Sequence, residues 1–165
     1  MSRIFVQLVV LAALLPGVSA RAEVMFPTGS RVGLSPPQGF SPSDAFRGFE
    51  EKQSGSAILT VELPAQAYGD IEKAMTASAL RKQGVIVEKR EPVTLKSGKG
   101  MLFVGHQDSD GKTMRKWILL GSTPPITALV TVLVPATAQA TYSDAAIRGA
   151  LSPSRYAKRS RSTSR

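Results

Sequence analysis

The fold is decided by residues 85–134, which read VIVEKREPVTLKSGKGMLFVGHQDSDGKTMRKWILLGSTPPITALVTVLV. This stretch holds four β-rich runs, which predict strands at 85–95, 100–107, 113–120 and 126–134. The connections between the runs have only four or five residues and are rich in Gly, Ser, Asp and Pro. Because a parallel crossover needs about a dozen residues or more, we expect the runs to pair as an antiparallel meander.

Both faces of this meander are predicted to be covered at its centre. Met101 and Phe103 point to one face of their strand, whereas Leu102 and Val104 point to the other. A strand that is apolar on both faces is typical of a sheet with a layer on each side.

Shorter strands upstream are expected to join the sheet. Residues 56–63 alternate with period two, which is typical of a half-buried strand. The apolar positions of this alternation are Ala57, Leu59, Val61 and Leu63, against Ser56, Ile58, Thr60 and Glu62. Residues 46–52 are predicted to pair with this strand through a turn at Ser54-Gly55. Residues 31–34 are predicted to form a short extended element.

A first helix is expected at 70–83. Asp70 in its first turn and Lys82 in its last turn suit the helix dipole, and Gly84 follows at the C-cap position. Its apolar residues are small to medium in size, so the helix should lie flat against the sheet.

A last helix is expected to start near Thr141 and to stop before Pro153. The spacing of Thr141 to Asp144 fits a capping box with Asp in place of Glu. Residues 21–153 are therefore predicted to form a single α+β domain, an antiparallel β-sheet of about six or seven strands with helices packed on it.

Residues 1–20 have the pattern of a cleavable secretory signal peptide. A positive start at Arg3 precedes an apolar run that a Pro-Gly pair interrupts before small residues, and cleavage is expected after Ala20, or alternatively after Ala22. The run has about 12 residues, whereas a spanning helix needs ~20. The sequence therefore predicts an exported protein, in the periplasm or secreted, with no transmembrane segment in the mature chain.

The chain has no cysteine, which excludes disulfides, thiolate catalysis and Cys-based zinc sites. Its formal net charge is +9, and the last twelve residues contribute five of its 21 Lys and Arg residues. Residues 154–165 have almost no apolar side chains and are predicted to be a disordered basic tail. Such a tail could bind an anionic envelope surface or only remain solvated, and export makes a nucleic-acid partner unexpected.

His106 is the only histidine, and Asp108 and Asp110 follow it with period two. Three such groups could hold a metal ion, or His106 and Asp108 could form a catalytic pair. However, residues 108–111 read Asp-Ser-Asp-Gly, which is a strong hairpin signal, so a plain strand end followed by a turn is favoured. Glu50, Glu51 and Glu62 are similarly interpreted as solvated charges.

Trp117 is the only tryptophan and lies in a basic strand segment beside Arg115 and Lys116. Arg115 and Trp117 share a face and could form a cation–π platform for an anionic or sugar-like ligand. A core position for Trp117 is the favoured interpretation. No residue is assigned as catalytic, as cofactor-binding or as a metal ligand, and no cofactor is expected.

Several of these segments, in this order, resemble the Mog1/PsbP-like superfamily, including its small exported bacterial members. The resembling segments are Val32–Phe40 (VGLSPPQGF), the strand at 56–63, the helix that follows it, and Lys116–Leu120 (KWILL) in the meander. The resemblance covers roughly Gly29 to Leu151, and Phe40 stands where such proteins often have Trp. It implies an α/β/α sandwich and a binding or accessory role, without shared catalytic residues.

Three hypotheses for function follow. The first is a non-enzymatic binding or accessory protein of the cell envelope, with a protein or an anionic surface as its partner. The second is a hydrolase centred on His106 and Asp108. The third is a carrier of a small ligand, with a pocket near Trp117. The sequence contains no feature that identifies the ligand or the oligomeric state.

Overall fold

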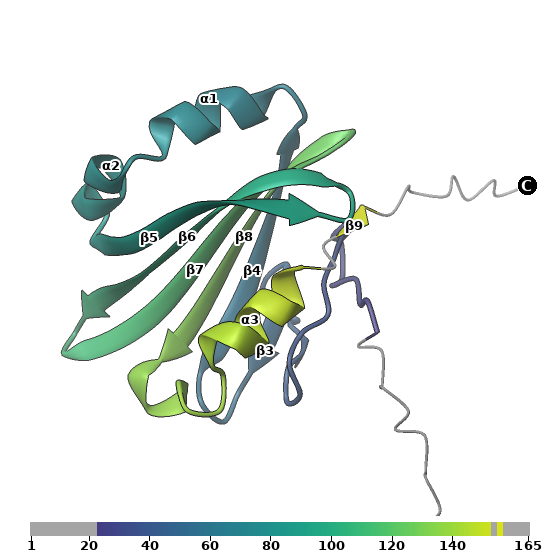
Figure 1. Cartoon of the computed structure of the whole chain (residues 1–165). Helices are drawn as coiled ribbons and strands as arrows, with labels where there is room; N and C mark the ends of the chain where they lie inside the picture. Colours follow the sequence, from purple (N-terminus) through teal and green to yellow (C-terminus); the bar gives the residue numbers. More distant parts are fainter. Residues whose placement is uncertain (1–22, 153–154, 157–165) are drawn as a thin grey trace, which may run out of the picture.

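The computed structural model of the chain describes residues 23–152 and 155–156 (Figure 1). In this part of the chain the strands are β1 (Val32–Gly33), β2 (Ser41–Pro42), β3 (Gly48–Glu51), β4 (Ser56–Pro64), β5 (Val85–Leu95), β6 (Gly98–Ser109), β7 (Lys112–Thr123), β8 (Ile126–Pro135) and β9 (Arg155–Tyr156). The helices are α1 (Ala67–Ala74), α2 (Ala77–Lys82), α3 (Asp144–Leu151) and the short 3-10 helix η1 (Ala136–Ala138).

Seven strands form one antiparallel sheet in the order β2-β3-β4-β8-β7-β6-β5. The predicted meander is confirmed, since β5, β6, β7 and β8 are neighbours in chain order and pair antiparallel. The predicted hairpin of β3 and β4 is also confirmed, with Glu51 opposite Ser56. The fold is therefore α+β, as the residue pattern predicted.

The hairpin turns of the meander are tighter than predicted. Each connection has two residues, the one between β6 and β7 being Asp110-Gly111. Asp110 has a φ of 51° and Gly111 a φ of 71°, the positive values that the favoured two-residue hairpin turns need. The prediction of a turn over 108–111 was therefore wrong for residues 108 and 109, which still belong to β6. Asp108 pairs with Thr113 across the hairpin.

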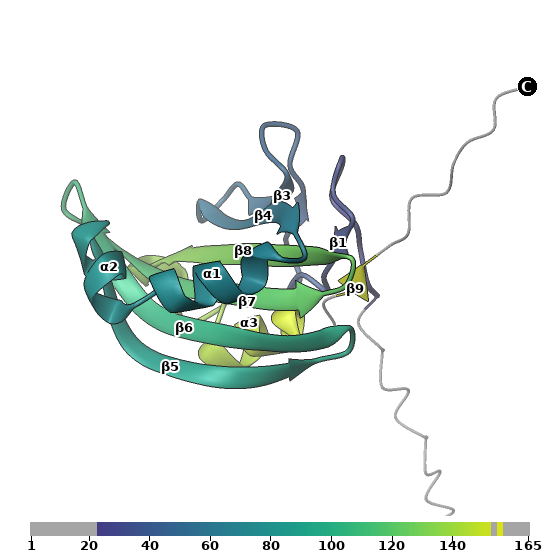
Figure 2. The same cartoon turned by 90° about the horizontal axis from the view of Figure 1, so that it is seen from above.

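Helices lie on both faces of the sheet, as Figures 1 and 2 show. On the face of α3, Ile147 and Leu151 join a large core with Leu102, Val104 and Trp117. A smaller core on the opposite face joins Leu80 of α2 to Val85, Phe103 and Ile118. The predicted burial of the central strands from both sides is confirmed, because alternate residues of β6 and β7 enter different cores.

The single helix predicted at 70–83 was wrong, because the chain forms α1 and α2 instead. Thr76 interrupts the helix with extended backbone angles, φ −94° and ψ 158°, and its hydroxyl accepts a hydrogen bond from the amide of Ala79. A threonine in this geometry satisfies an otherwise unpaired amide at the start of a helix, so a new helix begins there. Gly84 has a φ of 82°, which fits its predicted place just after the helix.

The start of the last helix was also predicted one turn too early. Ser143, and not Thr141, caps α3, and its hydroxyl oxygen accepts from the amide of Ala146. The amide of Thr141 donates to the carbonyl of Ala138 in the turn that follows η1. The capping box was misassigned because two hydroxyl residues near one another both suit an N-cap.

The buried face of β4 is the opposite of the one that its apolar pattern indicates. Ser56, Ile58 and Thr60 are buried, whereas Val61 is 46% exposed. The more apolar set, with Leu59 and Val61, faces the side of α1 and α2. Those helices cover only part of that face, so the set is left half-buried or exposed (Figure 2).

Two residues of the segment predicted to be disordered form a strand. Arg155 and Tyr156 make β9, which pairs antiparallel with Gly33 and Val32 of β1. The composition of the segment could not reveal this, because strand pairing uses backbone groups and needs no apolar side chain. The remaining residues of the predicted tail and the predicted signal peptide, 1–20, lie outside the described residues. Within the part that is described, no helix is long and apolar enough to cross a membrane.

Candidate functional site

The carboxylate beside His106 belongs to Glu88 and not to Asp108. Nδ1 of His106 lies 2.7 Å from Oε1 of Glu88. The register between β5 and β6 shifts between Val87 and Lys89, and this irregularity places Glu88 against His106. The sequence contained no signal for the contact, because the two residues are 18 positions apart and the bulge depends on strand pairing.

Arg115 completes this polar cluster from the next strand. It is the register partner of His106, and its Nη1 lies 2.7 and 2.6 Å from the two carboxylate oxygens of Glu88. Hydrogen bonds from Arg115, and next from His106, lower the pKa of Glu88. Glu88 therefore stays charged and orients the imidazole, but it divides its negative charge between two donors.

The other acidic residues considered from the sequence do not assemble. Asp108 accepts a hydrogen bond from the hydroxyl of Thr113 at 2.6 Å, and Asp110 lies in the turn. In the described ranges, no group of three His, Asp or Glu side chains could hold a metal ion. Glu50 and Glu51 have their own local contacts, with Lys52 and with Ser54.

Glu62 has a structural contact that its spacing did not reveal. Its two carboxylate oxygens accept from the amide and from Nε of Arg31, at 2.6 and 2.7 Å, and its side chain is only 11% exposed. Burial raises its pKa, but the hydrogen bonds from Arg31 outweigh that effect, so the pKa of Glu62 is lowered. Glu62 thereby ties the N-terminal segment to β4.

Trp117 lies in the core and not on a binding platform. Its side chain is 1% exposed, and its Nε1 donates to Oδ1 of Asp144 at 2.7 Å. Arg115 stacks over the ring with its guanidinium carbon 5.8 Å from the ring centre. The two residues share a face, as predicted, but the indole itself is closed off by α3.

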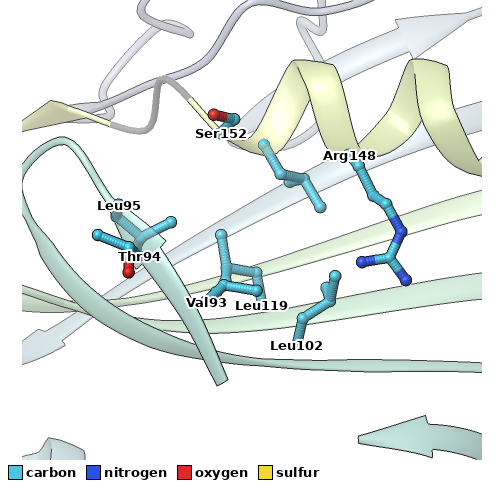
Figure 3. Close-up of a pocket in the computed structure, with 8 residues that line it drawn as sticks. Val93, Thr94, Leu95, Leu102, Leu119, Arg148 and Ser152 are labelled. Atoms are coloured by element: carbon cyan, nitrogen blue, oxygen red, sulfur yellow. The ribbon is translucent and has the colours of Figure 1, made fainter. Parts of the chain in front are cut away.

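A small pocket of about 260 Å³ lies between α3 and strands β5 to β7 (Figure 3). Val93, Leu102 and Leu119 form its sheet side, and Arg148 extends from α3 at one end. The guanidinium of Arg148 already binds the carboxylates of Asp144 and Glu91. Among the described lining residues, Arg148 is the one cation, and two acids neutralise it, which disfavours an anionic ligand there.

A larger groove of about 570 Å³ runs between α1 and α2 and the sheet. Its helix side consists of small and apolar residues that include Ile71, Ala74 and Met75. Its sheet side is formed by β5 to β8, with Ile118 and Leu129 among the lining residues. A volume in the range of about 300–1,000 Å³ with mainly apolar walls is typical of small-molecule sites.

Lys116 of β7 lines this groove. It is half-buried, and its side chain forms no hydrogen bond or ion pair with the described residues. Burial alone lowers the pKa of its ammonium group. The groove thus combines apolar walls with a partly desolvated cation that has no counter-charge among the described residues, whereas the pocket beneath α3 has a neutralised cation.

The groove continues across the sheet onto β4. Thr131 and Leu129 of β8, which line the groove, are the register partners of Leu59 and Val61. Leu59 is half-buried and Val61 is exposed, so an apolar surface extends from beneath the helices onto the uncovered part of the sheet. We refer to the groove and these two residues as the open face. Sequence reasoning identified the apolar stripe of β4 but assigned it to the core.

Comparisons with known proteins give no further assignment. No model of a known protein family matches the chain, and no curated protein matches it.

Proposed function

We propose that this chain is an exported, non-enzymatic binding protein of the cell envelope, and that its binding site is the open face. The predicted signal peptide supports the location. The resemblance to the Mog1/PsbP-like superfamily, whose members are binding or accessory proteins, supports the role. The proposal favours this face over the surroundings of Trp117, because the indole is enclosed beneath α3.

The observation that carries the proposal is the continuity of the groove with the exposed part of β4. Burial of apolar surface is favourable by about 25 cal/mol per Å², and Val61 is a large apolar side chain left 46% exposed. Exposed apolar residues that adjoin a groove mark an interaction surface more often than isolated ones do. A bound ligand with an apolar body would cover both parts at once.

Binding of Nile red, a neutral dye that fluoresces in apolar surroundings, tests this proposal on the full mature chain. Ala74→Phe should fill the groove, because Ala74 is exposed and lines it. Ala77→Phe is the matched control, since Ala77 is also an exposed helical alanine but lies outside the groove lining. We expect Ala74→Phe to lower dye affinity at least fivefold and Ala77→Phe to leave it within twofold.

Absence of dye binding, or an equal loss in the two variants, would contradict a binding site in the groove. The melting temperatures of both variants should stay within a few degrees of the parent, because both alanines are exposed. If the partner on this face is a protein, the parent and Ala77→Phe should capture it from an extract of the native envelope. Ala74→Phe should not capture it.

A hydrolase centred on His106 is the second candidate, and the 2.7 Å contact of His106 with Glu88 favours it. A carboxylate that orients an imidazole is a common arrangement for a general base. In this candidate Glu88 replaces Asp108 in the role of the acidic partner. His106→Ala should abolish hydrolysis of a panel of esters without changing the melting temperature. Gln107→Ala, on the other face of β6, should leave hydrolysis unchanged. Equal rates in both variants would exclude it.

A further inference from the structure

We propose that the groove binds a single-chain amphiphile with an anionic head group, the chain lying between α1–α2 and the sheet and the head group pairing with Lys116. This inference rests on the proposed function and names the class of ligand for the same site.

The charge in the groove is unusual within this protein. In the described part of the chain, the half-buried Lys and Arg residues are Arg31, Arg115, Lys116 and Arg148. The three arginines each contact at least one carboxylate. Lys116 has none, although partial removal from water costs a charged group free energy unless an opposite charge compensates. An anionic head group at Nζ of Lys116 would supply that compensation.

The cross-strand neighbours of Lys116 offer no competing acid. They are Gly105 on β6 and Leu133 on β8. Gln107 and Thr131, which also line the groove, are neutral and can donate hydrogen bonds. The electrostatic environment of Lys116 therefore favours an anion.

The shape of the groove favours one chain over a flat surface. Ile71 and Met75 face Ile118 and Leu129 across a concave space of about 570 Å³, which a planar membrane surface cannot enter. A flexible acyl chain can fill such a space, and each buried methylene would strengthen binding roughly fourfold while the chain still fits. Leu59 and Val61 extend the apolar surface for the end of a longer chain.

Displacement of Nile red by decanoate and by 1-decanol tests the inference, since the two ligands share an alkyl chain and differ in head-group charge. We expect the parent protein to bind decanoate more tightly than decanol, and laurate more tightly than octanoate. Lys116→Gln should weaken decanoate about tenfold and leave decanol within twofold. Lys112→Gln is the matched control, because it removes the same charge from an exposed position of the same strand outside the groove.

Lys116→Arg keeps the charge and should keep the preference for decanoate, which separates loss of charge from loss of packing. If the parent and Lys116→Gln bind decanoate with equal affinity, the inference is overturned. The proposed function stands in that case, provided that Nile red still binds. Absence of both dye and decanoate binding would contradict the proposed function as well. Sensitivity to Lys116→Gln seen with phosphatidylglycerol vesicles, but not with dispersed decanoate, would replace the single-chain ligand with a membrane surface and so overturn the inference.

Discussion

Nε1 of Trp117 donates a hydrogen bond to Oδ1 of Asp144 at 2.7 Å, and this contact joins the centre of the sheet to the first turn of α3. Oδ2 of the same carboxylate accepts from Nε of Arg148. Asp144 thus places a negative charge in the first turn of its own helix and accepts hydrogen bonds from the buried indole and from Arg148. This carboxylate therefore helps to hold α3 over the sheet, together with the buried side chains of Ile147 and Leu151.

Asp144→Ala should destabilise the protein by about 1–3 kcal/mol, because it leaves the buried N–H of Trp117 without its partner. Asp70→Ala is the matched control, since Asp70 is also an acid in the first turn of a helix but is exposed. We expect a change below about 0.5 kcal/mol for the control. Urea unfolding followed by the fluorescence of the single tryptophan measures both values, and equal losses would refute the role of the contact.

The contact of Glu62 with Arg31 predicts acid sensitivity. The pKa of Glu62 is lowered from its ordinary value of 4.5 in the folded state. The carboxylate therefore contributes stability that is fully present above pH 4.5 and is lost as the pH falls through the lowered folded value. Glu62→Gln should cost about 1–3 kcal/mol at pH 7 and progressively less below pH 4.5. Urea titrations from pH 7 to pH 2.5 measure this, with Glu23→Gln at an exposed position as control; a pH-independent cost would contradict the prediction.

The N-cap of α3 is Ser143 in the structure, whereas the sequence pattern predicted Thr141. Ser143→Ala should cost about 1 kcal/mol, because its hydroxyl accepts from the amide of Ala146. Thr141→Ala, at the cap that the sequence predicted, should change stability by less than half as much. Thermal or urea unfolding of the two variants decides between the two positions, and a larger loss for Thr141→Ala would support the earlier helix start.

The pairing of β1 with β9 predicts where the chain can be shortened. A chain that ends at Tyr156 should keep the native hydrogen-exchange protection of residues 31–35, because both register partners of β1 remain. A chain that ends at Ser154 should exchange faster in that segment, since Val32 and Gly33 lose their strand partners. Exchange of residues 98–109 in β6 provides the internal control. Identical exchange of residues 31–35 in the two chains would show that β9 does not protect β1.

Much of the fold could be predicted because its information is local. The β-rich runs of 85–134 and their short connections predicted the meander, and the Asp108–Gly111 segment indicated the hairpin between β6 and β7. The break at Thr76 was missed because a threonine is tolerated within a helix and becomes a cap only where the chain needs to turn. The candidate site was not predicted, since its parts come from α1, α2 and strands β5 to β8, far apart along the chain.

The sequence by itself determined the strand runs, their turns and the α+β class, because residues close along the chain control period-two alternation and turn geometry. Only the tertiary structure decided which face of β4 is exposed, that His106 contacts Glu88, and that Lys116 faces an apolar groove with no carboxylate among the described residues. These properties depend on which strands pair and on how far the helices reach across the sheet. Burial and charge pairing arise from contacts between distant residues, which no local pattern of residue types specifies.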